Sequence, residues 1–377
     1  MRTLALAAIL LATTAQAQFQ IQDSHTTASL RGIHSIGNGV AWASGTEGTV
    51  LRTTDEGATW QRCATPPDAE KLDFRGIQAF DQNTAIVMSS GKGDLSRLYK
   101  TTDACKTWKL VFTNPDKEGF FDAIKFPNSR LGYILGDPVD LPHPSDWDNP
   151  EPFHVFALYR TTNGGQTFRF VGPFKNGAGP GQTAFAASNS SLFVDPPYVI
   201  FGTGGSSGAR IYFDELPDLV TRTTWVEGDF YANSTSIPMQ ASNSAGIFSM
   251  GFRRYPRNRP ATHFEAAVAV GGDYRSPDDP HGTAAYAGET FTPWRPAQTP
   301  PHGYRSAVAY DPTTKTWITV GPNGTDISSD DGRNWTALKP AAQDPSDADK
   351  NWNALSLPFV VGPKGRIGKL RPEALKP

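Results

Sequence analysis

Arginines recur at the second residue of short apolar segments, where their guanidinium groups would be placed to bind an anion. Arg31, Arg75 and Arg305 hold this place in LRGI, FRGI and YRSA, and Asp122 holds it in FDAI. A guanidinium binds a carboxylate or a phosphate through two parallel hydrogen bonds. Arginines that converge from separate segments therefore fit an acidic ligand or an acidic partner surface.

Four more residues belong to the same candidate site. Asp137 and Asp273 lie in glycine hairpins that end apolar segments, and His302 and Tyr304 come just before Arg305. We expect all eight residues to surround one mouth of a central channel. Two interpretations stay open: the arginines bind a ligand or a partner, or they only satisfy carbonyl groups and pair with the aspartates.

An eight-residue pattern repeats along the chain and indicates which elements position these residues. It reads TTDEGATW at 53–60, TTDACKTW at 101–108, TTNGGQTF at 161–168 and SSDDGRNW at 328–335, with weaker traces at 287–294 and 224–225. The pattern residues are Asp55, Gly57 and Trp60; Asp103 and Trp108; Asn163, Gly165 and Phe168; and Asp330, Gly332 and Trp335. In the second copy Cys105 replaces the glycine.

The spacing of this pattern has a physical explanation. An Asp two residues after a Ser or Thr accepts backbone N–H groups and folds a tight turn, which a glycine completes at positive φ. We expect the closing Trp or Phe to pack the turn against its own sheet. Each copy then marks a hairpin between outer strands.

Apolar segments and glycine hairpins repeat in step with the turns and divide the chain into units. Seven segments, from 30–33 to 352–355, each precede a hairpin such as 44–48 or 361–365. The spacing of roughly 50 residues suits four-stranded propeller blades. We therefore predict an all-β fold: a seven-bladed β-propeller of four-stranded antiparallel blades, a single domain over 18–377. The last unit is one strand short, so the N-terminal strand is expected to close the ring.

These features resemble a known family. The opening stretch 30–60 and the stretches 303–312 and 320–335 are similar to the photosystem II stability and assembly factor-like propellers with Asp-box (BNR) repeats. The resemblance covers the mature chain and implies an exported, non-catalytic scaffold that binds a protein partner. It implies no cofactor.

The alternative is a glycoside hydrolase or lyase of the sialidase-like propeller type that acts on an acidic glycan. Such propellers place three arginines on the substrate carboxylate and use a Tyr–Glu pair. Tyr304 and the inner arginines fit this comparison. However, the family's Arg-Ile-Pro opening is absent, because the segment reads Leu30-Arg31-Gly32-Ile33, and no Glu stands where it would activate a tyrosine.

Other motifs give no support for catalysis. The stretch 204–208 matches G-x-S-x-G, but it lies in a strand-to-strand hairpin and not in the strand-to-helix turn of a nucleophile elbow. The run 202–208 lacks the third glycine of a dinucleotide fingerprint, so nothing supports a nicotinamide-dependent oxidoreductase. The histidines lack metal-binding spacing, and no metal is predicted.

The two cysteines, Cys63 and Cys105, fall on the outer strands of the first two units. In an exported protein they would either form a disulfide that joins these blades or remain two separate thiols. The sequence leaves both possibilities open.

Export is predicted by the N-terminus. Arg2 precedes an apolar run over 4–12, and Ala15-Gln16-Ala17 fits a signal-peptidase site, so residues 1–17 are expected to be a signal peptide cleaved after Ala17. The apolar run is too short to span a bilayer. The chain is expected to be a periplasmic or secreted monomer with no membrane span.

The amino-acid composition further restricts the fold class and the kinds of partner. The 36 Gly and 31 Pro among 377 residues disfavour long helices. The net charge of −2 gives no electrostatic case for a nucleic-acid partner. Two polar insertions, 137–154 and 273–283, are expected to project from one face, where they would either carry function or be variable decoration.

Overall fold

The computed structural model describes residues 18–141, 153–171, 177–196, 198–215, 233–254, 264–342 and 344–375. These residues form antiparallel sheets, with only two short 3-10 helices, η1 (Gly93–Leu95) and η2 (Pro372–Leu375). The expected signal peptide, most of the 137–154 insertion and the trace at 224–225 lie outside the described residues. The prediction of an all-β fold is confirmed.

Three four-stranded sheets come first along the chain, each ordered from the centre outward. The first contains β2 (Leu30–Gly37), β3 (Val40–Gly45), β4 (Val50–Thr53) and β5 (Gln61–Arg62). The second contains β6 (Phe74–Ala79), β7 (Ala85–Ser89), β8 (Arg97–Thr101) and β9 (Lys109–Thr113). The third contains β10 (Phe121–Lys125), β11 (Gly132–Leu141), β12 (Phe153–Thr161) and β13 (Arg169–Phe170).

A nine-stranded sheet follows, made of two four-stranded groups and the short strand β14 (Gln182–Thr183). One group contains β15 (Leu192–Asp195), β16 (Tyr198–Gly205), β17 (Arg210–Glu215) and β18 (Asn233–Ser236). The other contains β19 (Ser242–Arg254), β20 (Phe264–Asp273), β21 (Ala284–Ala287) and β22 (Arg295–Pro296). The groups are hydrogen-bonded into one sheet where the end of β16 pairs with the start of β19. The fourth of the seven apolar segments that are predicted to open the units, residues 184–187, forms no strand. These residues are an irregular connection from β14 toward β15.

Two more sheets complete the described chain. One contains β23 (Ala307–Asp311), β24 (Thr316–Val320), β25 (Thr325–Ser328) and β26 (Thr336–Ala337). The other contains β27 (Ala354–Ser356), β28 (Phe359–Val361), β29 (Ile367–Leu370) and the N-terminal strand β1 (Phe19–Gln22). β1 pairs with β29 in antiparallel register, from Phe19 opposite Leu370 to Gln22 opposite Ile367. The first and last strands of the chain are thus hydrogen-bonded to each other.

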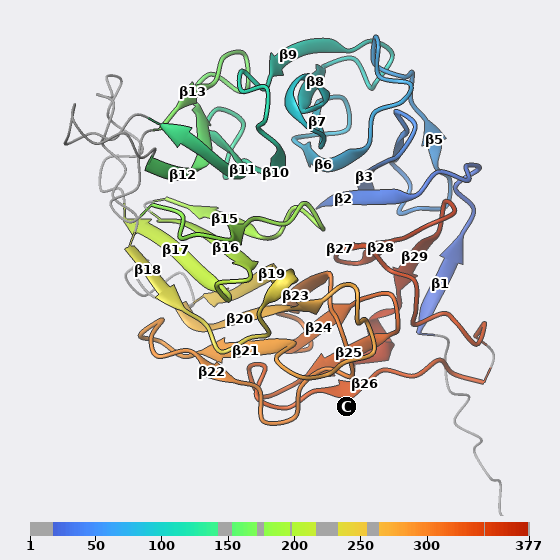
Figure 1. The fold of residues 1–377 in the computed structure, drawn as a ribbon. Helices are drawn as coiled ribbons and strands as arrows, with labels where there is room; N and C mark the ends of the chain where they lie inside the picture. Colours follow the sequence, from blue (N-terminus) through green and yellow to red (C-terminus); the bar gives the residue numbers. More distant parts are fainter. Residues whose placement is uncertain are drawn as a thin grey trace, which may run out of the picture.

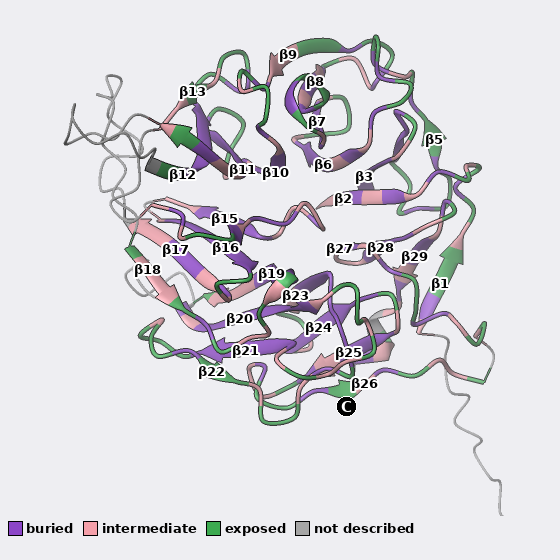
Figure 2. Cartoon of the chain, in the orientation of Figure 1, coloured by how far each residue is buried: buried purple, intermediate pink, exposed green. Residues whose placement is uncertain are grey.

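The sheets lie around a common centre (Figure 1). The innermost strands contact one another in the order β2, β6, β10, β15, β19, β23 and β27, and β27 contacts β2 again. Figure 2 shows buried residues along the inner and middle strands and exposed residues along the outer strands β5, β9 and β22. The core is therefore divided between the faces of neighbouring sheets.

Side chains of inner strands also tie several of the sheets to the next one. Each accepts a hydrogen bond from a backbone N–H in or directly after the following inner strand. The bonds are Ala79 N–H to His34 Nδ1 at 2.9 Å, Phe126 N–H to Gln78 Oε1 at 3.2 Å and Ser35 N–H to Ser356 Oγ at 2.9 Å. The last of these joins the final sheet to the first.

The neutral state of His34 is required for its bond. Burial, and then the charge of nearby Lys125, lower the pKa of His34 to about 3, from an ordinary value of 6.5. Because the unfolded chain binds this proton and the folded chain does not, stability falls as the pH drops from 6.5 toward 3. Between pH 6.5 and pH 5 the loss from this one group is about 2 kcal/mol.

His34→Gln tests this linkage, since Gln78 already makes the same type of bond in the next sheet. We expect the variant to lose about 2 kcal/mol less stability than wild type between pH 7 and pH 5, measured by urea unfolding. An identical pH dependence in both proteins would show that His34 does not titrate on unfolding.

Each of the four repeated turns contains the same pattern of hydrogen bonds. In the first, Gly57 N–H donates to Thr53 Oγ1 at 2.9 Å and Thr59 N–H donates to Asp55 Oδ1 at 2.9 Å. The corresponding bonds recur around Asp103, Asn163 and Asp330. The sequence pattern therefore encodes a turn held by its own side chains.

The aromatic residues that close the turns pack on their own sheets, as expected, and also contact a second sheet. Trp60 donates from Nε1 to Gln22 Oε1 at 2.8 Å and contacts Phe359 edge-on, and both partners belong to the last sheet. Trp108 donates to the carbonyl of Ala64, which follows the first sheet. Trp60 also shares a core cluster with Leu51 of its own sheet, and Trp108 shares one with Tyr99 of its own sheet. These rings therefore pack between their own sheet and the preceding one.

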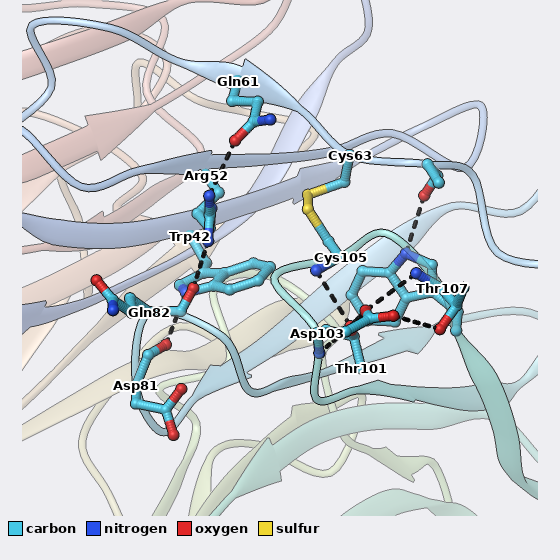
Figure 3. The surroundings of a disulfide bond; sticks show 12 residues. Trp42, Arg52, Gln61, Cys63, Asp81, Gln82, Thr101, Asp103, Cys105 and Thr107 are labelled. Carbon is cyan, nitrogen blue, oxygen red and sulfur yellow. Dashed lines mark hydrogen bonds between the residues drawn. A yellow bond between two sulfur atoms is a disulfide. The ribbon is translucent and has the colours of Figure 1, made fainter.

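A disulfide joins Cys63 to Cys105, with their Cα atoms 5.3 Å apart (Figure 3). Cys63 follows β5, and Cys105 lies in the second repeated turn after β8. Cys105 holds the place of the pattern glycine at a φ of 59°, a conformation that L-residues adopt at a cost. Of the two alternatives for the cysteines, the structure contains the bond, which joins the residue after β5 to the turn between β8 and β9 at the outer side of the first two sheets.

Candidate functional site

A cavity of about 550 Å³ lies at the centre, at one end of the inner strands. Its walls come from every sheet of the described chain. Among the residues that line it are Arg31, Arg75, Asp122, Asp137, Thr183, Phe185, Phe248, Tyr274, Tyr304 and Asn353. Five of the eight predicted site residues are in this set: Arg31, Arg75, Asp122, Asp137 and Tyr304.

Three of these side chains reach the cavity because of irregularities in the inner strands. The register shifts between Leu30 and Gly32, between Phe74 and Gly76, and between Phe121 and Ala123. The residue left unpaired is Arg31 at the first shift, Arg75 at the second and Asp122 at the third. A bulge re-aims the side chain of its extra residue. The predicted equivalence of these three positions is thus a shared backbone feature.

The two arginines share an aspartate that the sequence analysis did not include. Arg75 Nε donates to Asp73 Oδ2 at 2.8 Å, and Arg31 Nε lies 3.7 Å from Asp73 Oδ1. Arg75 also donates to the carbonyl of Ala186. Both side chains stay about one-third exposed, at 34% and 31%. The sequence held one indication that Asp73 belongs to the site, since Asp73 stands two residues before Arg75.

Arg31 is held by fewer hydrogen bonds to the described residues than Arg75 is. Burial, and then the charge of Arg75, lower its pKa, while Asp73 opposes the shift. The described residues provide no hydrogen-bond acceptor for its Nε. Its guanidinium therefore keeps donors available for a group that enters the cavity.

The opposite charge comes from Asp122 and Asp137. Asp122 is 2% exposed, and its Oδ2 has no hydrogen-bond partner among the described residues. Burial, and then the nearby carboxyl of Asp137, raise its pKa well above the ordinary value, against the effect of Arg75. Burial also raises the pKa of Asp137, although Thr183 Oγ1 and Ala184 N–H donate to it at 2.6 and 3.0 Å. Two acidic groups with raised pKa values thus face one cavity, and one of them, Asp122, lacks a donor for Oδ2 among the described residues.

Aromatic rings form another part of the wall. Phe185 and Phe248 stack at 4.1 Å, and Tyr304 meets Phe248 edge-on at 4.8 Å. Tyr274, at 6.1 Å from Phe248, is 46% exposed at the rim. Because these rings come from separate segments between residues 185 and 304, no local sequence pattern predicted their assembly.

The prediction for Arg305 was wrong by one residue. The backbone N–H groups of Leu30, Arg305 and Trp352 all donate to the first hairpin glycine of the preceding sheet, at 3.0, 2.9 and 3.2 Å. Arg305 therefore corresponds to the buried Leu30, and Ser306 corresponds to Arg31. The side chain of Arg305 is 0% exposed and does not line the cavity.

Arg305 instead belongs to a buried ionic cluster. Its Nε donates to Asp326 Oδ2 at 2.8 Å, and Asp326 Oδ1 lies 2.7 Å from His302 Nδ1. Burial raises the pKa of Asp326, but the hydrogen bond from His302 and the charge of Arg305 outweigh it and lower that pKa. His302 therefore sits beside this cluster and not in the cavity wall.

Asp273 does not line the cavity either. It accepts a hydrogen bond from Ser242 Oγ at 2.7 Å and another from Arg275 N–H at 2.9 Å. These bonds fold the start of the 273–283 insertion, of which Tyr274 reaches the cavity rim. Asp273 thus has a local structural role.

Comparisons with solved structures identify the architecture. YCF48 bound to D1 peptide matches with a TM-score of 0.58 at 17% identity, covering 94% of this chain and 96% of that one. YCF48 from Cyanidioschyzon merolae matches with a TM-score of 0.59, also at 17% identity, over 95% and 100% of the two chains. The chain is a β-propeller. The resemblance to assembly factor-like propellers is thus confirmed for the fold.

A more distant propeller also matches. An ancestral GH74 enzyme has a TM-score of 0.54 at 11% identity, and the match covers 93% of this chain but 46% of that one. No protein-family model and no curated protein sequence matches the propeller. Within the described ranges, none of its helices has the length and apolar character needed to cross a bilayer.

Tyr304 does not fit the role of the tyrosine nucleophile in a sialidase-like propeller. Burial raises the pKa of Tyr304, and among the described residues no carboxylate is hydrogen-bonded to it. Its hydroxyl therefore stays protonated, whereas a tyrosine nucleophile needs an adjacent base.

Proposed function

We propose that this protein is an exported, non-catalytic scaffold that binds a segment of a partner protein in its central cavity. In this proposal the described sheets are seven blades, closed into a ring by β1, and residues 18–377 act as one monomeric domain. Residues 1–17 direct the chain to the periplasm or the outside of the cell.

One observation carries the proposal: charged side chains from three different sheets face one open cavity with unmet hydrogen-bonding capacity. Arg31 keeps free donors, and Asp122 keeps a free acceptor. A buried polar group without a partner costs free energy, so such groups mark a place that a ligand completes. The structure of YCF48 bound to D1 peptide supports this use, because there a propeller of the same overall fold binds a peptide.

Retention of a mixture of octapeptides with blocked termini tests the proposal. Wild-type protein is expected to retain peptides enriched in Asp and Glu, whose carboxylates accept from Arg31 and Arg75. The double variant Arg31→Ala/Arg75→Ala should retain at least about 10-fold less, because each lost charged hydrogen bond is worth roughly 1.5–3 kcal/mol.

The matched control is Arg62→Ala/Lys109→Ala, which removes the same charge from exposed positions on outer strands of the same two sheets. It should behave like wild type. Equal retention by the control and the cavity variant would contradict binding at the cavity.

Cleavage of an acidic glycan is the second candidate, favoured by the carboxyls of Asp122 and Asp137 in one cavity. An acid with a raised pKa can protonate a leaving oxygen. Turnover of an acidic glycan by the purified protein, lost in Asp122→Asn, would favour this candidate over the scaffold.

A further inference from the structure

We propose that the occupant of the central cavity presents a primary ammonium or guanidinium group to the carboxyls of Asp122 and Asp137. The inference rests on the proposed function and names the chemistry of the bound segment on the side away from the arginines. Its two supports are the unpartnered buried carboxyl of Asp122 and the balance of charge around the cavity.

The carboxyl of Asp122 is placed for a donor that no described residue supplies. Asp122 is 2% exposed, lines the cavity and makes no hydrogen bond through Oδ2 to any described residue. Neither Asp122 nor Asp137 takes part in an ion pair with a described residue, although Asp137 accepts bonds from Thr183 and Ala184. Among the described residues, this buried carboxyl therefore has neither a donor for Oδ2 nor an ion-pair partner, which costs free energy.

The arginines do not supply that counter-ion. Arg75 is held on Asp73 at 2.8 Å, and Arg31 lies 3.7 Å from the same carboxyl. Asp73 and Asp137 balance the two guanidiniums as long as Asp122 holds a proton, and ionisation of Asp122 gives the site an excess of one negative charge. An entering cation removes that excess.

The aromatic wall also fits a cation. Phe185, Phe248, Tyr274 and Tyr304 line the same cavity as the two carboxyls. The face of an aromatic ring attracts an ammonium or guanidinium, more strongly when the site is desolvated. Carboxyls and rings around one cavity are thus complementary to a Lys or Arg side chain.

Protonation links binding to pH. The charged and titratable groups that face Asp122 are Asp137 from β11 and Arg75 from β6, with Arg31 and Tyr304 elsewhere in the cavity wall. Burial, and then the carboxyl of Asp137, raise the pKa of Asp122, so without a cation this carboxyl keeps its proton to a higher pH than an ordinary aspartate does. A bound cation stabilises the carboxylate, so binding releases up to one proton and strengthens as the pH rises.

Calorimetry with two matched probes tests the inference: acetyl-Glu-Phe-Lys-amide and the same peptide with norleucine in place of Lys. We expect wild type to bind the Lys peptide at least about 10-fold more tightly, with proton release seen by comparing two buffers of different ionisation enthalpy. Asp122→Asn should abolish both the preference and the proton release. Asp94→Asn, which removes an exposed carboxylate outside the cavity wall, should keep both.

A third probe, n-butylamine, separates the two sources of the cation. Displacement of the Lys peptide by millimolar n-butylamine would show that a free amine suffices, whereas failure to compete would assign the site to a side chain on a peptide. Either result supports a cation site. Equal binding of the Lys and norleucine peptides, or no binding of either while the octapeptide mixture is retained, overturns the inference and leaves the scaffold function standing.

Discussion

Replacing Arg305 with alanine is expected to lower the free energy of unfolding by about 3–5 kcal/mol, although the residue lies outside the binding cavity. The guanidinium is fully buried and donates to Asp326, which is itself 2% exposed. Removing it leaves a buried carboxylate without its main counter-ion. Urea unfolding followed by tryptophan fluorescence measures the loss.

A compensating variant separates this explanation from a simple packing defect. Arg305→Met/Asp326→Leu removes both charges and keeps apolar volume, so its stability should recover to within about 1–2 kcal/mol of wild type. Arg31→Ala, in the corresponding part of the first sheet but one-third exposed, should cost less than about 1 kcal/mol. A harmless Arg305→Ala, or a double variant no better than the single one, would contradict the buried ion pair.

Loss of the disulfide has the second largest expected effect. The bond closes a loop with a sequence separation of 42 residues, so removing it with Cys63→Ala/Cys105→Ala should cost about 4 kcal/mol through the entropy of the unfolded chain. Position 105, however, has a φ of 59°. Glycine adopts this conformation freely, and alanine does so at a cost of about 1 kcal/mol.

Cys63→Ala/Cys105→Gly should therefore be about 1 kcal/mol more stable than the double alanine variant, while both stay below wild type. Urea unfolding of the three proteins at one pH provides the comparison. If Cys63→Ala/Cys105→Gly were less stable than Cys63→Ala/Cys105→Ala, the claim that a non-glycine residue at position 105 costs stability would be contradicted. Neither variant should alter peptide retention, since the bond lies on outer strands.

Much of the fold followed from residues that act locally. Turn formation depends on side chains within eight residues, so Asp55 and Asp330 predicted their turns correctly. The glycine hairpins likewise marked strand ends. Segment 184–187 failed as a strand because its apolar composition carries no information on pairing, and β14 and β15 took the positions beside β16.

The candidate site was only partly predictable, because it depends on register and on distant contacts. A bulge of the same kind occurs at Arg31, at Arg75 and at Asp122, and the equivalence of these positions was visible in the sequence. Arg305 looked equivalent, but a one-residue slip moves a strand residue from the cavity to the core. Asp73 and the ring of Phe248 joined the site through packing between sheets, which no spacing along the chain reports.

The central claim is that the cavity itself binds the partner segment, and filling the cavity tests it most directly. Ala187 lines the cavity and Ala58 lies exposed in the first repeated turn, so Ala187→Trp and Ala58→Trp add the same bulk at two places. Retention of the blocked octapeptides should fall at least 10-fold in Ala187→Trp and stay unchanged in Ala58→Trp, with both proteins folded. Full retention by a folded Ala187→Trp protein would contradict the claim.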